Sequence, residues 1–126
     1  MSKVVFIVDD SRTVRASVEY TLKKEGYQVE QAVDGQDGIN RLEELRQKGI
    51  RPGMIISDIN MPNLDGIGFI KEIKKSLHYK FIPVLVLTTE SQDEKKMEGK
   101  QAGAAGWLVK PFSPEQLIGV VKKFVK

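Results

Sequence analysis

Five strand-like segments alternate with five helix-like segments along this chain, and that alternation limits the accessible folds more than any other feature. The first strand-like segment, residues 4–8, contains no polar residue and is rich in β-branched side chains. Such a run is typical of a strand that is buried on both faces. Buried strands that alternate with helices form a parallel sheet with right-handed crossovers and helices on both faces. We therefore predict an α/β domain with a doubly wound, five-stranded parallel sheet.

Apolar runs and turn residues place the strands at residues 4–8, 27–33, 54–57, 81–87 and 106–109. A helix is expected after each of them. The last helix has the clearest start, because Ser113 can cap it, Pro114 suits its first turn and Gln116 completes a capping box. Its helical spacing predicts a buried stripe of Leu117, Val120, Val121 and Phe124.

The fourth helix is predicted to be the weakest of the five. It covers about residues 91–101 and has only Met97 and Ala102 as expected core contacts. Gly99 lowers its intrinsic helical stability further. We therefore expect a loosely held helix in this part of the chain.

The composition fits a single globular domain that spans residues 1–126. The chain has no cysteine, which excludes disulfides and thiolate metal sites and agrees with a reducing cytoplasm. No signal-peptide pattern precedes the first strand and no apolar stretch is long enough to cross a membrane, so we expect a cytoplasmic protein. The net charge is +3, but the lysines are interleaved with Asp and Glu, which predicts solvated helix faces rather than a nucleic-acid surface.

Polar residues gather where the predicted strands end. Asp9 and Asp10 follow the first strand, Asp58 follows the third, Thr88 the fourth and Lys110 the fifth. In an open parallel sheet the carboxyl ends of the strands lie along one edge, and ligands bind in the crevice there. The sequence thus predicts a site with three carboxylates, a hydroxyl and an ammonium.

Carboxylates this close together repel one another and stay ionised only if a cation lies among them. Ligation by oxygen alone favours a hard ion, Mg²⁺ first, with Mn²⁺ able to substitute. A carboxylate surrounded by a metal, an ammonium and a hydroxyl can act as a nucleophile toward a phosphoryl group and form an acyl phosphate. The alternatives at single positions are structural: Asp10 or Ser11 could cap the first helix, and Lys110 could be one half of a salt bridge.

Five motifs make the pattern specific, and in chain order they read FIVDDSRTVR, AVDGQDGI, SDINMPNLDG, VLVLTTE and AGAAGWLVKPF. With these motifs the chain resembles the receiver domains of two-component response regulators over essentially its whole length. It is most similar to the single-domain receivers of chemotaxis. The resemblance implies a flavodoxin-like (βα)5 fold with strand order 2-1-3-4-5.

The resemblance also implies roles for the acidic residues. Asp58 is the expected phosphoacceptor. Asp9 and Asp10 are the expected acidic pair that holds Mg²⁺, together with Asp58 and the backbone carbonyl of Asn60. The positions expected to tune access to the site and the loss of the phosphoryl group are Asn60, Thr89 and Glu90.

A conformational switch is implied as well. Thr88 is the hydroxyl expected to reach for the bound phosphoryl group, and Lys110 is the ammonium expected to pair with it. The Lys110–Pro111 peptide bond is expected to be cis. Trp107 stands where the family usually has Tyr or Phe, as the aromatic that moves between outward and inward rotamers, and its greater bulk opposes a fully inward position.

The implied function is a phosphorylation switch that assists its own phosphorylation and dephosphorylation but is not otherwise an enzyme. A histidine kinase supplies the phosphoryl group, and a downstream protein reads it on the surface of the fourth helix, fifth strand and fifth helix. No output domain is expected after residue 126, so we expect a monomer that acts by binding, with the flagellar motor switch as the first candidate target. A phosphorelay intermediate is the alternative within the family.

Two other classes of protein use similar elements. Haloacid dehalogenase-like phosphatases also place Asp, Thr, Lys and Mg²⁺ at strand ends, but their nucleophile follows the first strand, with a second acid two residues later where this chain has Ser11. A flavodoxin-like cofactor binder needs a phosphate-binding loop after the first strand, where this chain has the acidic segment DDSRTVR. Both classes remain as alternatives outside the receiver family.

Overall fold

The computed structural model describes residues 3–89 and 93–125, which form a five-stranded parallel sheet. Its strands are β1 (Val4–Val8), β2 (Gln28–Ala32), β3 (Met54–Asp58), β4 (Val84–Thr88) and β5 (Gly106–Val109). They lie in the order β2-β1-β3-β4-β5, and each neighbouring pair is parallel. The predicted strand order is therefore confirmed.

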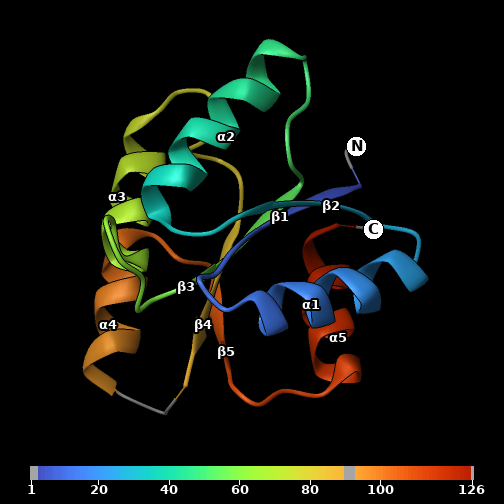
Figure 1. The fold of residues 1–126 in the computed structure, drawn as a ribbon. Coiled ribbons are helices and arrows are strands. Elements are labelled where there is room, and N and C mark those ends of the chain that lie inside the picture. Colours follow the sequence, from blue (N-terminus) through green and yellow to red (C-terminus); the bar gives the residue numbers. More distant parts are fainter. Residues whose placement is uncertain (1–2, 90–92, 126) are drawn as a thin grey trace.

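The helices in the described part of the chain are α1 (Arg12–Lys24), α2 (Gly35–Gln47), α3 (Gly66–Lys75), α4 (Asp93–Ala102) and α5 (Pro114–Phe124). Helices α1 and α5 lie on one face of the sheet, and α2, α3 and α4 lie on the other (Figure 1). The sheet is thus the middle of three layers. None of the helices in residues 3–89 and 93–125 combines the length and the apolar character that spanning a membrane requires.

Successive residues of the inner strand β1 pack against the two helical layers in turn. Val5 and Ile7 belong to the core shared with α1 and α5, whereas Phe6 and Val8 belong to the core shared with α2, α3 and α4. All four side chains are fully buried. Burying one such side chain stabilises the fold by roughly 1.5–3 kcal/mol. Two covered faces explain why this strand has no polar side.

Three strands differ from their predicted bounds: β2 is one residue shorter at each end than the predicted 27–33, β4 ends one residue later than predicted, at Thr88, and the start of β4 and the end of β3 change as follows. Strand β4 begins at Val84 rather than at Phe81, whose side chain is 76% exposed. Between them Pro83 has no N–H to donate, although its carbonyl accepts a 2.9 Å hydrogen bond from the N–H of Ile55. Strand β3 extends one residue further than expected, to Asp58, which therefore sits on the regular ladder with β4.

Two side chains that were expected in the core are exposed. Met97 of α4 is 58% exposed and Phe124 of α5 is 37% exposed. In α4 the inward position is taken by Gly99, which packs against a side chain of β4. At the end of α5 the buried residue is Val125, whose carbonyl accepts a 2.7 Å hydrogen bond from the hydroxyl of Tyr27. The apolar spacing therefore placed these contacts on the wrong residues.

Each N-cap side chain in the described structure accepts a hydrogen bond from the N–H three residues later; the caps of α1, α2, α3 and α5 are Ser11, Asp34, Asp65 and Ser113. The predicted capping box is confirmed, because the N–H of Ser113 also donates to Oε1 of Gln116 at 2.8 Å. Since Ser11 is the cap of α1, the carboxylate of Asp10 is not needed for that purpose.

Candidate functional site

Three carboxylates converge at the carboxyl edge of the sheet. Asp9 and Asp10 follow β1, and Asp58 is the last residue of the neighbouring strand β3. One carboxylate oxygen from each lies within 4.8 Å of those from the other two. Asp9 and Asp58 are buried, whereas Asp10 is exposed and opens the cluster to solvent. The convergence predicted from the strand ends is therefore present.

The backbone holds the Asp58 carboxylate in place. Its side chain lies at a position that is 6% exposed, and Oδ1 accepts a 2.8 Å hydrogen bond from the N–H of Ile59. The chain then turns tightly, since the N–H of Gly66 donates to the carbonyl of Ile59 at 2.8 Å. The second oxygen of Asp58, Oδ2, lies 3.5 Å from Nζ of Lys110. One oxygen is thus fixed by the main chain, and the other faces the cluster.

Asp9 is more enclosed than Asp58. Its Oδ1 accepts a 2.8 Å hydrogen bond from the N–H of Ser11, and its Oδ2 accepts one of 2.9 Å from Nζ of Lys110. Its backbone carbonyl accepts a 2.6 Å hydrogen bond from Nη1 of Arg15. Arg15 was not predicted as a residue of the site. It lies four residues after the cap Ser11, on the same face of α1, and that spacing could have indicated it. Arg15 therefore fixes the acidic pair from the side of α1.

Lys110 supplies the ammonium of the site and bridges two acids. Its Nζ lies 2.9 Å from Oδ2 of Asp9 and 3.5 Å from Oδ2 of Asp58, and its side chain is only 14% exposed. Lys110 therefore forms the salt bridge that one interpretation of the sequence expected, and it does so inside the acidic cluster. The Lys110–Pro111 peptide bond is cis, as the resemblance implied.

Burial and the neighbouring charge of Asp9 raise the pKa of Asp58 above the ordinary value of 3.8. Lys110 and the N–H of Ile59 oppose this shift but do not cancel it. A single ammonium does not balance the three carboxylates, so a divalent cation among Asp9, Asp10 and Asp58 would relieve their repulsion. Carboxylate oxygens are also the donors that Mg²⁺ prefers. The residues present therefore fit the predicted ion.

The remaining predicted site residues lie around this cluster or outside the described residues. Thr88 ends β4 at a position that is 6% exposed, and its carbonyl accepts a 2.6 Å hydrogen bond from the backbone N–H that follows β5. Asn60 and Thr89 are exposed. Trp107 of β5 is 40% exposed, so its ring is partly open to solvent. Glu90 lies outside the described residues.

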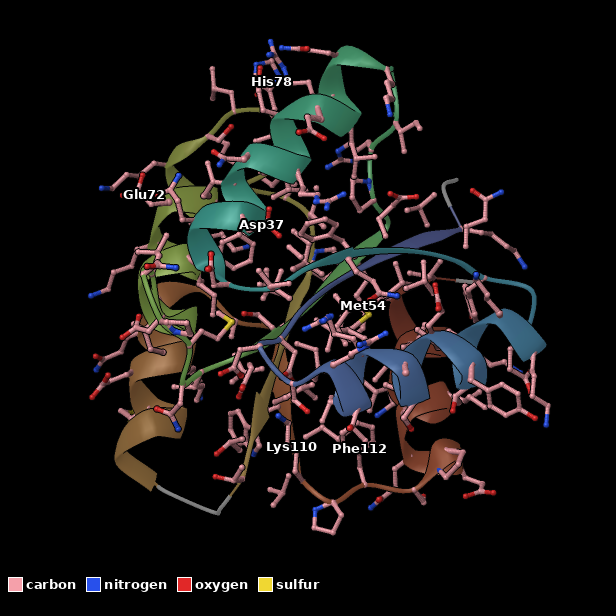
Figure 2. All side chains as sticks on the ribbon, viewed as in Figure 1. Asp37, Met54, Glu72, His78, Lys110 and Phe112 are labelled. Atoms are coloured by element: carbon pink, nitrogen blue, oxygen red, sulfur yellow. The ribbon has the colours of Figure 1, made fainter. Side chains whose placement is uncertain are left out.

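Another hollow lies at the opposite edge of the sheet, where the strands begin. Its volume is about 230 Å³, and its lining residues are Arg46, Gly49, Ile50, Arg51, His78 and Tyr79. Figure 2 shows His78 at one end of the molecule and Lys110 toward the other. Ordinary ligand pockets measure roughly 300–1,000 Å³, and Nη1 of Arg46 is already paired with Glu43 at 2.8 Å. The chemistry predicted from the sequence is therefore at the other edge.

A family model for the response regulator receiver domain matches residues 5–122, a span that contains the acidic cluster, Thr88 and Lys110. The chain belongs to the response regulator receiver domain family. In this receiver domain Asp9, Asp10 and Asp58 form an acidic cluster whose oxygens could hold a metal ion.

Known proteins similar to this receiver domain include a chemotaxis protein and the protein PilG. The chemotaxis protein CheY4 of Vibrio cholerae is 44% identical, with a TM-score of 0.89, and the match covers 98% of this chain and 99% of that one. The protein PilG of Pseudomonas aeruginosa is 36% identical over 121 residues, which are 96% of this chain and 86% of PilG.

Two further matches are to a longer regulatory protein and to a receiver domain whose structure contains a metal ion. The phosphate regulon transcriptional regulatory protein PhoB of Escherichia coli is 31% identical over 126 residues, and this receiver domain spans 53% of its length. The receiver domain of the sensor histidine kinase PA1611 from Pseudomonas aeruginosa has a TM-score of 0.87, and the match covers 99% of this chain and 98% of that one. Because the two chains are only 24% identical, this match supports the fold of our chain and nothing further. The PA1611 structure contains a magnesium ion in its active-site cleft.

We expect the metal-free receiver domain to lose stability as the pH rises through the pKa of Asp58. The folded state raises this pKa above 3.8, so folding favours the protonated acid. The resulting stability is complete below pH 3.8 and is lost as the pH rises through the folded pKa. Asp58→Asn avoids this loss, so near neutral pH its free energy of unfolding should exceed that of the wild type by about 1–3 kcal/mol. Urea unfolding in a chelator measures the difference.

Two controls accompany this measurement. Well below pH 3.8, where Asp58 is protonated in both the folded and the unfolded state, the two proteins should unfold at similar urea concentrations. At neutral pH, MgCl₂ should stabilise the wild type more than the variant, because a cation screens the charge that the variant lacks. A stability difference that did not change with pH would contradict a penalty that arises from ionised Asp58.

Proposed function

We propose that this receiver domain is a phosphorylation switch that accepts a phosphoryl group on Asp58. The observation that carries the proposal is the position of the Asp58 carboxylate, with Oδ1 held by the N–H of Ile59 and Oδ2 facing Lys110 beside two further acids. Phosphoryl transfer asks a protein mainly to position the reacting groups and to neutralise charge. A fixed carboxylate between a cation and a metal-binding acidic pair supplies both.

The proposed donor is a phosphohistidine of a histidine kinase. An oxygen of Asp58 attacks the phosphorus in line with the bond to the imidazole. The new O–P bond forms as the N–P bond breaks, and the imidazole nitrogen leaves with the bonding electrons. Lys110, whose Nζ is 3.5 Å from Oδ2 of Asp58, is placed to pair with an oxygen of the transferred group.

Asp9, Asp10 and Asp58 are the residues that would hold Mg²⁺, and the family resemblance adds the backbone carbonyl of Asn60. When bound, the ion neutralises charge on the phosphoryl oxygens. The oxygens of the three acids, which lie within 4.8 Å of one another, support this assignment. Mn²⁺ is the proposed substitute because it accepts the same donors.

The proposed switch runs from Thr88 to Trp107. Thr88 moves toward the phosphoryl group, and Trp107 on the neighbouring strand β5 changes its position in response. The surface of α4, β5 and α5 then has a different shape in the phosphorylated and unphosphorylated states. A partner protein that binds one of these two conformations more tightly reads the signal. Apolar side chains exposed on α4 and β5 support this surface as a docking site; they are Met97, Trp107 and Val109.

The protein is proposed to assist its own phosphorylation and dephosphorylation without acting as an enzyme on other substrates. With a small phosphodonor and MgCl₂, we expect the wild type to take up a single phosphate per chain, on Asp58, because both oxygens of Asp9 already accept hydrogen bonds and Asp10 is exposed. Hydroxylamine should remove the label, since it cleaves acyl phosphates. Mass spectrometry measures both results. Repeated turnover of a small phosphate ester would instead favour a haloacid dehalogenase-like phosphatase.

Control of a flagellar motor in chemotaxis is the proposed output, on the basis of the 44% identity to a chemotaxis protein. A phosphorelay intermediate is the alternative. Binding to a motor-switch protein only after treatment with beryllofluoride, which mimics a phosphoryl group, would favour the first. Onward transfer of phosphate to a histidine of another protein would favour the second. In either case we propose a monomer that acts in the cytoplasm.

A further inference from the structure

Asp34 connects two elements beside the proposed phosphorylation site. It caps α2 and is only 7% exposed, and each of its oxygens has a different partner. Oδ1 accepts a 2.8 Å hydrogen bond from the N–H of Asp37, and Oδ2 accepts one of 2.7 Å from Nδ2 of Asn63. Asn63 is 29 residues away, in the 59–65 loop between β3 and α3. These hydrogen bonds hold the pKa of Asp34 below its ordinary value, so it stays a carboxylate.

The residues that follow bring the same two segments into backbone contact. The N–H of Gly35 donates to the carbonyl of Leu64 at 3.0 Å. A Cβ at position 35 would collide with that carbonyl, so a larger residue does not fit there. Asn63 has a φ of 67°, in the left-handed region that Asn tolerates better than most residues. We term Asp34, Gly35, Asn63 and Leu64 the clasp.

The clasp fixes the middle of a loop whose two ends are held in other ways. At its start, the carbonyl of Ile59 accepts the hydrogen bond from Gly66, and at its end Asp65 caps α3. Asn60, whose carbonyl is expected to face the metal, lies between the fixed start and the clasp. Asn60 itself is exposed, and in this loop Met61 and Leu64 are half-buried against the core, so side-chain packing restrains residues 61 and 64 but not Asn60. The clasp is thus the polar restraint on the exposed part of the loop, and it acts together with the packing of Met61 to place the Asn60 carbonyl.

We propose that the Asp34–Asn63 hydrogen bond is a positioning device that presets the 59–65 loop and so sets the affinity of the receiver for Mg²⁺. The inference rests on the proposed function, because it requires an ion beside Asp58 that Asn60 helps to hold. Asp34 and Asn63 are positioning residues, and neither belongs to the acidic cluster. Groups that orient a metal ligand from outside typically contribute about 10-fold or more to metal affinity.

Three variants separate the clasp from effects of charge and of helix capping. Asn63→Gly removes the amide but suits the left-handed backbone, and it should weaken Mg²⁺ binding about 10-fold. Asn63→Asp sets a second carboxylate against Asp34; the added charge alone would strengthen cation binding, so weaker binding reports the broken clasp. Asp34→Asn combined with Asn63→Asp exchanges donor and acceptor at constant net charge and should restore the wild-type affinity to within about twofold.

Two readouts report on the metal and on the clasp independently. Amide chemical shifts during a titration with MgCl₂ give the dissociation constant. Hydrogen exchange at the N–H of Gly35, which donates to Leu64, reports on the clasp in metal-free protein and should be faster in both single variants. The matched control is Gln36→Ala, which removes an exposed amide from the first turn of α2 that bonds Asn40 at 3.3 Å. It should change neither readout.

Unchanged Mg²⁺ affinity in both single variants, together with faster exchange at Gly35, would overturn the inference and leave the clasp a purely structural contact. A double variant that binds Mg²⁺ as weakly as the single variants would also overturn it. Failure of the proposed function has a different signature, because the wild type itself would then bind no Mg²⁺ or take up no phosphate, and the inference would fall with it.

Discussion

Asp58→Asn should take up essentially no phosphate from a small phosphodonor in the presence of MgCl₂, a loss of at least about a thousandfold. A side-chain amide is a poor nucleophile toward phosphorus. Asp9 does not replace the lost carboxylate, because it is fully enclosed at 0% exposure and both its oxygens accept hydrogen bonds, from Ser11 and Lys110. Asp10 follows the strand end and is exposed, without the backbone support that positions Asp58. Mass spectrometry of the intact chain measures the uptake.

The loss should not come from unfolding. The amide oxygen of Asp58→Asn can still accept the hydrogen bond from Ile59, and the substitution removes one of three charges that repel one another. Glu72→Gln is a matched control, since Glu72 is an exposed acid on α3 that pairs with Lys75 at 3.3 Å, and this variant should be labelled like the wild type. Stoichiometric phosphate on another strand-end carboxylate of Asp58→Asn would remove Asp58 from its proposed role.

The site could be predicted because strand ends are a local property of this sequence. Strand β1 and the first three residues of β3 are apolar, every residue of both strands is buried, and the acids Asp9 and Asp58 stand at the ends of these strands. Parallel pairing then places both acids at the same edge. Thr88 lies at the end of β4, where the sequence placed it, although the predicted start of β4 was wrong, because only the end of the strand positions that residue.

Contacts between distant segments could not be predicted in the same way. Asp34 and Asn63 each look like an ordinary loop residue, and only the fold shows that one donates to the other. Helical spacing placed Phe124 in the core, but α5 ends at that residue. The buried position belongs instead to Val125, whose carbonyl accepts the hydroxyl of Tyr27. Periodicity describes a helix interior and says little about how the chain leaves the helix.

Gly66→Ala should lower the free energy of unfolding by about 3 kcal/mol and weaken Mg²⁺ binding. Gly66 is the buried first residue of α3, and a Cβ there would collide with the carbonyl oxygen of Asp58 and lie 2.8 Å from Cα of Ile59. Both are backbone atoms, so no rotamer change relieves the contact. Strand β3 is paired on both sides, with β1 and β4, and all its residues are buried, so it cannot move aside alone. The strain therefore reaches the residue that carries the proposed chemistry.

Gly119→Ala is the matched control, because Gly119 lies exposed in α5 and an added Cβ would have no neighbour within 4 Å. That variant should instead gain about 0.5–1 kcal/mol, since Ala favours a helix over Gly. Gly68→Ala should fall between the two, because its added Cβ meets the flexible end of the Leu64 side chain. Urea unfolding and MgCl₂ titration of all three variants measure these effects. A Gly66→Ala protein as stable as the wild type would mean that α3 can withdraw from β3, and that the backbone does not hold Asp58 as tightly as its hydrogen bonds indicate.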